Sequence, residues 1–309
     1  MQELQPESVS KKILITGIDG FTGSYFEQFL IKRGYDVYGT IFNYKTLNKK
    51  HFQCDIRNKK EVYNIIKMVV PDYILHFAAI SFVEEKNKNL MYDVNVLGTQ
   101  NLLECIIENN LNPKKVIIVS SAAVYGEQNT SVLAENLCPK PINHYGYSKY
   151  IVERIASTFF SKLKIIVVRP FNYTGYTQSK KFLIPKIVSH FSEKTKSIEL
   201  GNINVSREFN NIYDIAHSYL ELLICESDSI VVNICSGNSI NINYIINYLN
   251  SIANYKIQVK IDKELVRNNE INDLKGSNIL LNSLIPYRFK YNIDQTINEM
   301  YNLLKSKVL

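Results

Sequence analysis

The chain has 309 residues, of which 46% are hydrophobic, so it can bury a large core and wholesale disorder is excluded. Its formal net charge of +7 suits a polyanionic small ligand. The basic residues are scattered, however, whereas nucleic-acid binding calls for a concentrated patch, so we expect no nucleic-acid partner. Five cysteines without a C-x-x-C pair or zinc-type histidine spacing indicate reduced thiols in a cytoplasmic protein and no metal site. The polar N-terminus lacks the features of a signal peptide, and no apolar run is long enough to suggest a membrane partner.

From residue 12 onward, short β-branched runs alternate with amphipathic segments. We expect strands at 12–16, 35–41, 51–54, 73–78, 115–120 and 164–169, and helices at 23–33, 59–69, 90–109 and 145–162. This alternation predicts βαβ units, and runs that are apolar on both faces are typical of parallel strands covered on both sides. The fold class predicted is α/β, a Rossmann-type doubly wound parallel sheet.

Beyond residue 169 the alternation loosens. We expect helices near 184–193, 213–224, 241–251 and 294–305, and one further strand at 230–235. Because no linker separates the two parts, they are expected to be interleaved. The predicted dinucleotide-binding domain covers 11–171 with a return near 205–235, and a smaller C-terminal lobe covers 172–204 and 236–309. The cleft between such parts is the default ligand site.

The first predicted strand leads directly into TGIDGFTG, in which Gly17, Gly20 and Gly23 are spaced G-x-x-G-x-x-G. Glycines at these places permit a tight turn, a close approach of the backbone to a pyrophosphate, and close packing of the following helix. The helix N-terminus adds backbone N–H groups and a positive dipole. A strand before the turn and a helix after it favour a dinucleotide site over an ordinary βα turn.

The end of the second strand bears on which cofactor is bound. NAD-preferring folds often place an acid there for the ribose 2′-hydroxyl, and none occurs between Val37 and Lys45. Thr40, Asn43 and Lys45 would tolerate a 2′-phosphate, which favours NADPH over NADH. After the third strand, Asp55 and Ile56 are placed to grip an adenine edge, although Asp55 could instead be a helix N-cap.

A Tyr-x-x-x-Lys pair on a helix places both side chains on one face, and a nearby ammonium makes the phenol a better proton donor and acceptor. The spacing alone is uninformative here, because it occurs at Tyr63, Tyr145, Tyr176 and Tyr301. Tyr145 and Lys149 begin a helix after the fifth strand, and open α/β sheets bind ligands at the carboxyl ends of their strands. This position favours Tyr145 and Lys149 as the functional pair.

The fifth strand delivers SSAAVYG to the same edge, where a serine hydroxyl could share a substrate oxygen with Tyr145. Together with ILITGIDGFTGSY, HFAAISFV, VNVLGTQNLLE and YGYSK, this stretch resembles the extended short-chain dehydrogenase/reductase family, in its nucleotide-sugar branch. In the family's pattern the catalytic hydroxyl falls five residues before the glycine, which is Ser121, and Ser120 is then a packing or cofactor-side residue. His144 departs from the proline that usually precedes the tyrosine.

The resemblance implies further binding residues. Phe21, Thr22, Ala78 and Ala79 would line the cofactor site with the glycines, and Lys149 would also orient the cofactor ribose. The later stretches RPFNYTGYTQSKKF, ELGNINVSREFNNIYDI and VVNICSG resemble GDP-4-keto-6-deoxy-D-mannose reductases, so 172–204 and 236–309 would form a nucleotide-sugar lobe. Ser81 would either touch a sugar hydroxyl or cap a helix. The residues that the resemblance assigns to the nucleotide diphosphate and its ribose are Asn172, Lys186, Arg207, Arg267 and Glu270.

Two alanines bear on the reaction. Dehydratases of the family carry an acid and base where Ala122 and Ala123 stand, and methyl groups cannot move protons, which favours simple reduction. The expected reaction is NADPH-dependent reduction of the C4 ketone of a GDP-linked 4-keto-6-deoxy sugar, GDP-4-keto-6-deoxy-D-mannose or a heptose analogue. A 4-epimerase with bound NAD is the main alternative, and a 4,6-dehydratase or a non-catalytic redox sensor is less favoured. By family habit, we expect a homodimer.

Overall fold

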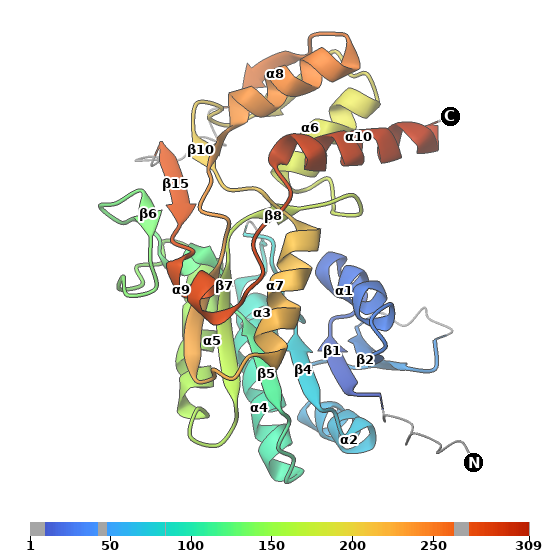
Figure 1. The fold of residues 1–309 in the computed structure, drawn as a ribbon, viewed down its shortest axis with the longest axis vertical. Helices are drawn as coiled ribbons and strands as arrows, with labels where there is room; N and C mark the ends of the chain where they lie inside the picture. The colour runs from blue at the N-terminus through green and yellow to red at the C-terminus, as the bar shows by residue number, and fades with distance from the viewer. Residues whose placement is uncertain (1–9, 43–47, 84, 263–271, 309) are drawn as a thin grey trace, which may run out of the picture. The chain divides into compact units, whose positions relative to one another are not determined.

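The computed structural model describes residues 10–42, 48–83, 85–262 and 272–308 and is shown in Figure 1. The chain forms two compact units, each assembled from separate stretches of sequence. One unit takes in residues 1–119, 151–167 and 228–230. The other takes in 120–150, 168–227 and 231–309. The polypeptide therefore passes from one unit to the other several times, and neither unit is one continuous segment.

Helices and strands alternate through the first 119 residues. The strands are β1 (Lys12–Thr16), β2 (Asp36–Ile41), β3 (His51–Gln53), β4 (Tyr73–His76) and β5 (Lys115–Val119). The helices are α1 (Phe21–Ile31), α2 (Lys59–Val69), α3 (Lys88–Tyr92), a π-helical turn (Asp93–Leu97) and α4 (Gly98–Glu108).

The remainder of the chain is more irregular, with several two-residue strands. The helices are a short 3₁₀ helix (Ala122–Val124), α5 (His144–Thr158), α6 (Leu183–Ser192), α7 (Ile212–Ile224), α8 (Ile242–Ala253), α9 (Ile279–Leu284) and α10 (Ile293–Val308). The strands are β6 (Val132–Leu133), β7 (Ile165–Pro170), β8 (Tyr173–Thr174), β9 (Ser197–Leu200), β10 (Ser206–Arg207), β11 (Asn210–Asn211), β12 (Ile230–Ile234), β13 (Ile240–Asn241), β14 (Gln258–Ile261) and β15 (Asp273–Gly276).

A parallel sheet of seven strands has the order β12-β7-β5-β4-β1-β2-β3, which confirms the predicted fold class. Strand β1 pairs in parallel with β2 on one side and β4 on the other, so Thr16 is in register with both Thr40 and His76. The order of strands reverses at β1, and such a switch point is where open α/β sheets bind ligands. The carboxyl ends of β1 and β4 therefore meet at one edge.

Burial on both faces explains why these runs form central strands. Ile13, Leu14 and Ile15 in β1 are almost fully buried, as are Ile74 and Leu75 in β4. A strand without a solvent-facing side has no reason to alternate polar and apolar residues. Helix α2, by contrast, is amphipathic: the Asn58 side chain caps its first turn, and its buried residues recur at helical spacing.

The single helix predicted over 90–109 is wrong in one respect, because a π-helical turn at Asp93–Leu97 interrupts it. The turn brings Asn95, which is 1% exposed, to the segment after β4. There its Oδ1 accepts the Ile80 N–H at 2.8 Å and its Nδ2 donates to the Ile80 carbonyl at 3.1 Å. Isolated π-turns of this kind frequently mark functional sites, and no hydrophobic pattern reveals them.

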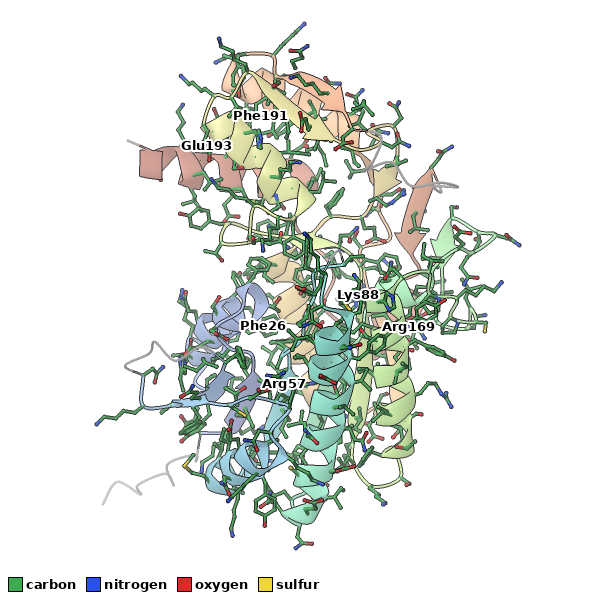
Figure 2. All side chains as sticks on the ribbon, turned by 180° about the vertical axis from the view of Figure 1, so that it is seen from behind. Phe26, Arg57, Lys88, Arg169, Phe191 and Glu193 are labelled. Atoms are coloured by element: carbon green, nitrogen blue, oxygen red, sulfur yellow. The ribbon has the colours of Figure 1, made fainter. Side chains whose placement is uncertain are left out.

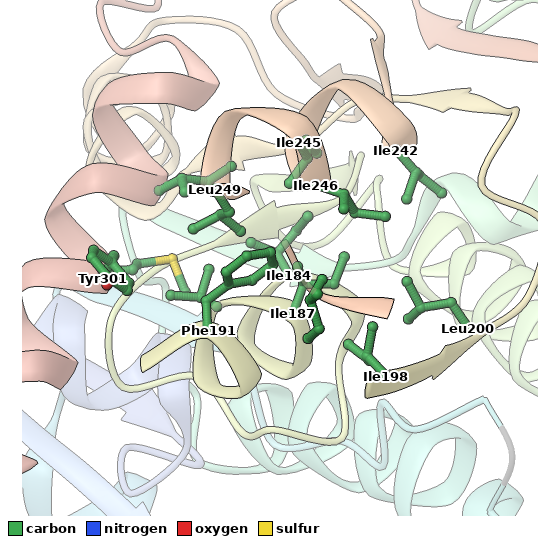
Figure 3. Close-up of a cluster of buried hydrophobic side chains, with 14 of the residues drawn as sticks. Ile184, Ile187, Phe191, Ile198, Leu200, Ile242, Ile245, Ile246, Leu249 and Tyr301 are labelled. Atoms are coloured by element: carbon green, nitrogen blue, oxygen red, sulfur yellow. The ribbon is translucent and has the colours of Figure 1, made fainter. Parts of the chain in front are cut away.

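The second unit has a small mixed sheet, β13-β10-β15-β6, and a hydrophobic core of its own. Figure 3 shows that core, in which Phe191 from α6, Leu249 from α8 and Tyr301 from α10 face one another. Ile198 and Leu200 of β9 close the cluster. Among the described residues, no helix combines the length and the apolar character needed to cross a membrane.

Candidate active site

The turn after β1 is tightly packed and requires glycine. Gly17 has φ +69°, in the left-handed region, and a Cβ there would lie 2.9 Å from backbone atoms of Ala78. Its N–H donates to the Thr40 hydroxyl at 3.2 Å, and the Ile18 N–H donates to the Thr40 carbonyl at 3.0 Å. The turn is thus held from β2 on one side and touches the segment after β4 on the other.

The other two glycines differ in what surrounds them. A Cβ on Gly23 would lie 2.4 Å from the Gly17 carbonyl oxygen, so this glycine is needed for α1 to pack on the turn. Gly20 precedes α1 as its N-cap, and a Cβ there would meet only the Gly17 oxygen, at 3.3 Å. Phe21 and Thr22 form the first, half-buried turn of α1, which contains no acidic residue. This geometry fits a pyrophosphate at the helix N-terminus.

Thr40, one of the residues expected to tolerate a cofactor 2′-phosphate, contacts the glycine turn. The Thr40 side chain is 5% exposed, and its hydroxyl already accepts the Gly17 N–H. Thr40 therefore helps to hold the glycine turn. Asn43 and Lys45, the other residues considered for a 2′-phosphate, lie outside the described residues.

Asp55 and Ile56 follow β3, as predicted, but Asp55 is engaged by its neighbour. The Arg57 guanidinium, labelled in Figure 2, donates to Asp55 Oδ2 at 2.6 Å and lowers the pKa of that carboxyl. The alternative reading of Asp55 as a helix N-cap is wrong, since Asn58 caps α2. Ile56 is buried against Gly98 of α4, where any added Cβ would collide with it.

The segment after β4 runs beside the glycine turn. The Ala78 N–H donates to the Thr16 hydroxyl at 3.2 Å, and Asn95 holds both backbone groups of Ile80. Ala79 is half-buried, whereas Ser81 is exposed. Ala78 and Ala79 are therefore fixed at the edge where β1 and β4 end, and Ser81 projects from it.

The start of α5 packs against the 3₁₀ turn that follows Ser121. The Asn143 side chain accepts the Gly146 N–H at 2.8 Å and so caps the helix. A Cβ on Gly146 would lie 2.7 Å from the Ala123 carbonyl oxygen, so glycine permits this close approach. The contact brings Tyr145 beside Ser121. Side chains at positions 122 and 123 are methyl groups, and neither can exchange a proton.

Ser121, Tyr145 and Lys149 form one cluster. The Tyr145 phenol hydrogen-bonds the Ser121 side chain, whose Oγ also accepts the Ala123 N–H at 3.1 Å. Lys149 Nζ lies 6.0 Å from the centre of the Tyr145 ring. Ser120, in contrast, is 1% exposed, and its N–H donates to the Val168 carbonyl, in keeping with a packing role.

Burial shifts both titratable groups of the cluster. It raises the pKa of the Tyr145 phenol to about 12, and the hydrogen bond from Ser121 opposes this shift. It lowers the pKa of the Lys149 ammonium to about 8. At neutral pH the phenol therefore carries the proton that a ketone reduction needs, beside a lysine that is still largely charged.

Distance between tyrosine and lysine does not distinguish the Tyr-x-x-x-Lys pairs. Lys67 Nζ lies 5.9 Å from the Tyr63 ring and Lys305 Nζ 6.0 Å from the Tyr301 ring, as close as in the Tyr145 pair. Burial does distinguish them, because Lys149 is 5% exposed while Lys67 and Lys305 are exposed. A perturbed, buried titratable group in a polar cluster is typical of a functional site.

The lowered pKa of Lys149 leads to a pH prediction. If the expected nicotinamide cofactor binds here, kcat/KM for that cofactor, which reports the free enzyme, should be level at lower pH and fall as the pH rises through about 8. The charged lysine is present below its pKa and lost above it, so the rate follows the charged form. Lys149→Arg should keep a positive charge and remove the fall, at a lower rate. A wild-type kcat/KM that stays constant to two pH units above the pKa of Lys149 would contradict this role of the lysine.

Three of the residues expected to bind the nucleotide diphosphate take part in hydrogen bonds that involve backbone carbonyls. Lys186, in the first turn of α6, donates to the Glu199 carbonyl at 2.7 Å, and Arg207 in β10 donates to the Ser206 carbonyl at 2.8 Å. Asn172 is exposed, and its carbonyl accepts the Asn210 N–H. Arg267 and Glu270 lie outside the described residues.

Sequence reasoning missed Glu208, the neighbour of Arg207. Its carboxylate is 1% exposed and accepts the Gly276 N–H at 2.6 Å, the Ser236 N–H at 3.0 Å and the Asn210 side-chain amide at 3.2 Å. Burial raises its pKa, against these hydrogen bonds. Glu208 thereby ties β10 to β15 and to the turn after β12. The sequence signal that could have identified Glu208 was an acidic residue directly after Arg207, in a segment that is otherwise uncharged.

The sheet order, the glycine turn and the Ser121, Tyr145, Lys149 cluster together define a Rossmann-type short-chain dehydrogenase/reductase. Residues 14–300 match the family model described as GDP-mannose 4,6 dehydratase. The chain belongs to this family, whose members act on nucleotide sugars.

Named relatives are similar along nearly the whole chain. The GDP-6-deoxy-D-talose 4-dehydrogenase of Aggregatibacter actinomycetemcomitans is 36% identical over 94% of this chain and 97% of its own. The GDP-6-deoxy-D-mannose reductase of Pseudomonas aeruginosa is 25% identical over 97% of this chain and 99% of its own.

Two solved structures have the same fold. A candidate epimerase from Burkholderia cenocepacia has a TM-score of 0.90 at 32% identity and covers 96% of this chain and 99% of its own. RMD from Pseudomonas aeruginosa, complexed with NADPH, has a TM-score of 0.86 at 24% identity and covers 96% of this chain and 100% of its own. The protein is thus an NAD(P)-dependent nucleotide-sugar oxidoreductase or epimerase.

Proposed function

We propose that the protein uses NADPH to reduce the C4 ketone of a GDP-linked 4-keto-6-deoxy sugar, GDP-4-keto-6-deoxy-D-mannose in the first instance. The observation that carries this proposal is an intact Ser121, Tyr145 and Lys149 cluster beside two alanines. A reduction needs a hydride, one proton and a group that binds the developing oxyanion. A 4,6-dehydration needs a further acid and base, and Ala122 and Ala123 offer neither.

The relatives' names support the same carbon and the same nucleotide. One is named for the oxidation of a GDP-6-deoxyhexose at position 4, and the other for a reduction that yields a GDP-6-deoxyhexose. Talose and mannose differ in configuration at C4, so both names fit hydride transfer to a common 4-ketone. The proposed product is GDP-D-rhamnose, which is GDP-6-deoxy-D-mannose, or its C4 epimer.

The described residues suit a nicotinamide dinucleotide. The pyrophosphate would lie on Gly17–Gly23 at the N-terminus of α1, with Ala78 and Ala79 alongside and Asp55 and Ile56 towards the adenine. The NADPH complex of RMD supports the choice of cofactor. Bound NADPH would supply the hydride.

The proton chemistry falls to this chain's own side chains. Ser121 and Tyr145 would hydrogen-bond the ketone oxygen, and Tyr145 would donate its proton to that oxygen as the C4 alcohol forms. Its O–H bond breaks and leaves a phenolate, which the charge on Lys149 stabilises until solvent returns the proton. Because both pKa shifts stem from burial, they depend on water being kept away from the cluster.

Binding of the GDP moiety is proposed for 172–204 and 236–309. Arginine suits phosphate because its guanidinium donates two parallel hydrogen bonds, which favours Arg207 and Arg267 as phosphate ligands. Asn172 and Lys186 would assist, Glu270 would accept from ribose hydroxyls, and Ser81 would touch the sugar. We also propose a homodimer. Leu97 at the end of the π-helical turn and Tyr147 and Ile151 in α5 are exposed side chains that could take part in such an interface.

The proposal is tested with purified protein, NADPH and GDP-4-keto-6-deoxy-D-mannose made in situ by a 4,6-dehydratase. We expect NADPH oxidation equal to the sugar reduced, and NMR should show a C4 alcohol whose couplings give its configuration. A 4-epimerase would instead retain NAD through purification and consume no NADPH. The reductase proposal fails if NADPH is not oxidised with GDP-, dTDP-, CDP- or UDP-linked 4-keto sugars.

A further inference from the structure

A buried chain of hydrogen bonds links the strand ends beneath the proposed cofactor site. His76, the last residue of β4, is 4% exposed. Its Nδ1 lies 2.7 Å from the Thr16 hydroxyl at the end of β1, and its Nε2 lies 2.9 Å from the Thr99 hydroxyl in α4. Thr16 and Thr99 are each 1% exposed. The histidine therefore joins β1, β4 and α4 in one polar chain within the core.

The direction of each hydrogen bond follows from the ends of this chain. The Thr99 oxygen lies 2.6 Å from the Asn95 carbonyl, which can only accept, so the single hydroxyl proton of Thr99 is used there. Thr99 must then accept from His76 Nε2. At the other end, the Ala78 N–H can only donate, and it donates to Thr16 at 3.2 Å. A neutral His76 protonated on Nε2 accepts the Thr16 proton at Nδ1 and completes the chain.

The hydrogen-bonded chain ends on two backbone groups near the proposed cofactor site, the Ala78 N–H and the Asn95 carbonyl. At one end, Thr16 holds Ala78, whose backbone touches Gly17 so closely that a Cβ on Gly17 would collide with it. At the other end, Thr99 bonds the Asn95 carbonyl inside the π-helical turn, and the Asn95 side chain holds Ile80. His76 thus stands between the anchors of residues 78 and 80.

We propose that His76 is a positioning residue for the cofactor, held as the neutral Nε2–H tautomer, that fixes the Ala78–Ile80 segment against the glycine turn. It touches no substrate and acts through Thr16 and Thr99. A protonated His76 would donate hydrogen bonds from both ring nitrogens. The Thr16 hydroxyl oxygen would then accept from both His76 Nδ1 and the Ala78 N–H, and the buried Thr16 hydroxyl proton would lose Nδ1 as its acceptor. The inference rests on a dinucleotide binding at Gly17–Gly23, which is part of the proposed function.

The tautomer is tested on the unaltered protein. Long-range ¹H–¹⁵N NMR separates protonated from unprotonated ring nitrogens, and the chain has five histidines, so the His76 signals can be identified by their loss in His76→Asn. We expect His76 at neutral pH to show a protonated Nε2 and an unprotonated Nδ1. A protonated Nδ1, in a neutral or a charged ring, would overturn the proposal.

The positioning role is tested by NADPH affinity, measured by fluorescence without any sugar. His76→Leu removes both hydrogen bonds and should weaken NADPH binding about tenfold, the order of effect of losing one or two buried hydrogen bonds. His76→Asn keeps an acceptor near Nδ1 and should recover most of the affinity. Ile66→Val, at a buried site in α2 without polar contacts to the site, controls for loss of stability and should bind NADPH normally.

Two results would overturn the positioning role: a His76→Leu variant that folds and binds NADPH like the wild type, or equal weakening in Ile66→Val. Because the measurement needs no sugar, it separates this inference from the proposed reaction. The protein could show the expected His76 tautomer and the expected NADPH affinities in the variants, yet reduce no 4-keto sugar. The role of His76 would then stand, and the proposed reductase activity would fail.

Discussion

Replacing Tyr145 with phenylalanine is expected to lower kcat for ketone reduction by roughly 10²–10⁴-fold, the usual contribution of a general acid. The phenol is the group that donates to the ketone oxygen, and Phe removes its proton while it keeps the ring that packs beside Lys149. NADPH affinity should change little, because the proposed cofactor contacts come from other residues. Steady-state kinetics and fluorescence titration measure the two effects separately.

Tyr147→Phe is the matched control for this prediction. Tyr147 lies two residues along the same helix and is 45% exposed, so losing its hydroxyl should leave kcat unchanged. If Tyr145→Phe retained turnover within about threefold of the wild type, Tyr145 would not be the proton donor. A biological effect that persisted without turnover would favour a redox-sensing protein on this fold.

Replacing Gly23 with alanine is expected to weaken NADPH binding by at least about tenfold, and to destabilise the fold by about 1–3 kcal/mol through overpacking. The added methyl would lie 2.4 Å from the Gly17 oxygen and 2.6 Å from the Ile18 Cα. Both are backbone atoms, so the clash can be relieved only by moving the turn away from α1. Isothermal titration with NADPH and denaturant unfolding measure the two effects.

Gly34→Ala provides a control with a similar loss of stability. Gly34 has φ +81°, so alanine is strained by about 1–2 kcal/mol, but its Cβ would meet no atom of the described residues within 4 Å. Affinity for NADPH should be unchanged in this variant. Equal NADPH affinity in Gly23→Ala and the wild type would mean that the close packing at the turn does not shape the cofactor site.

Local signals made the sheet and the glycine turn predictable. The strands β1, β4 and β5 are read directly from sequence because burial on both faces leaves their central residues apolar, with polar residues only at the strand ends. Gly17 and Gly23 stand out since their spacing falls between a strand and a helix. The position of Tyr145 after the fifth strand also favoured it over the equally spaced pairs, and its partner Lys149 is buried whereas Lys67 and Lys305 are exposed.

Contacts between distant parts of the chain were not predictable. Thr16 and His76 are 60 residues apart, and neither carries a pattern that announces a shared hydrogen bond. The hydrogen bond from the Gly17 N–H to the Thr40 hydroxyl was also not foreseen, because it depends on the register of β1 and β2. Glu208 and the π-helical turn were missed for the same reason: each is defined by the partners that the fold supplies.

The central claim is that this chain passes a hydride from NADPH to C4 of a GDP-linked 4-keto sugar. Its most direct test uses NADPH deuterated at nicotinamide C4, in each of the two stereochemical forms, with NMR of the sugar product. We expect one of the two forms to place deuterium on C4 of a GDP-6-deoxyhexose, in an amount equal to the NADPH oxidised. A product without deuterium at C4 from either form would contradict it.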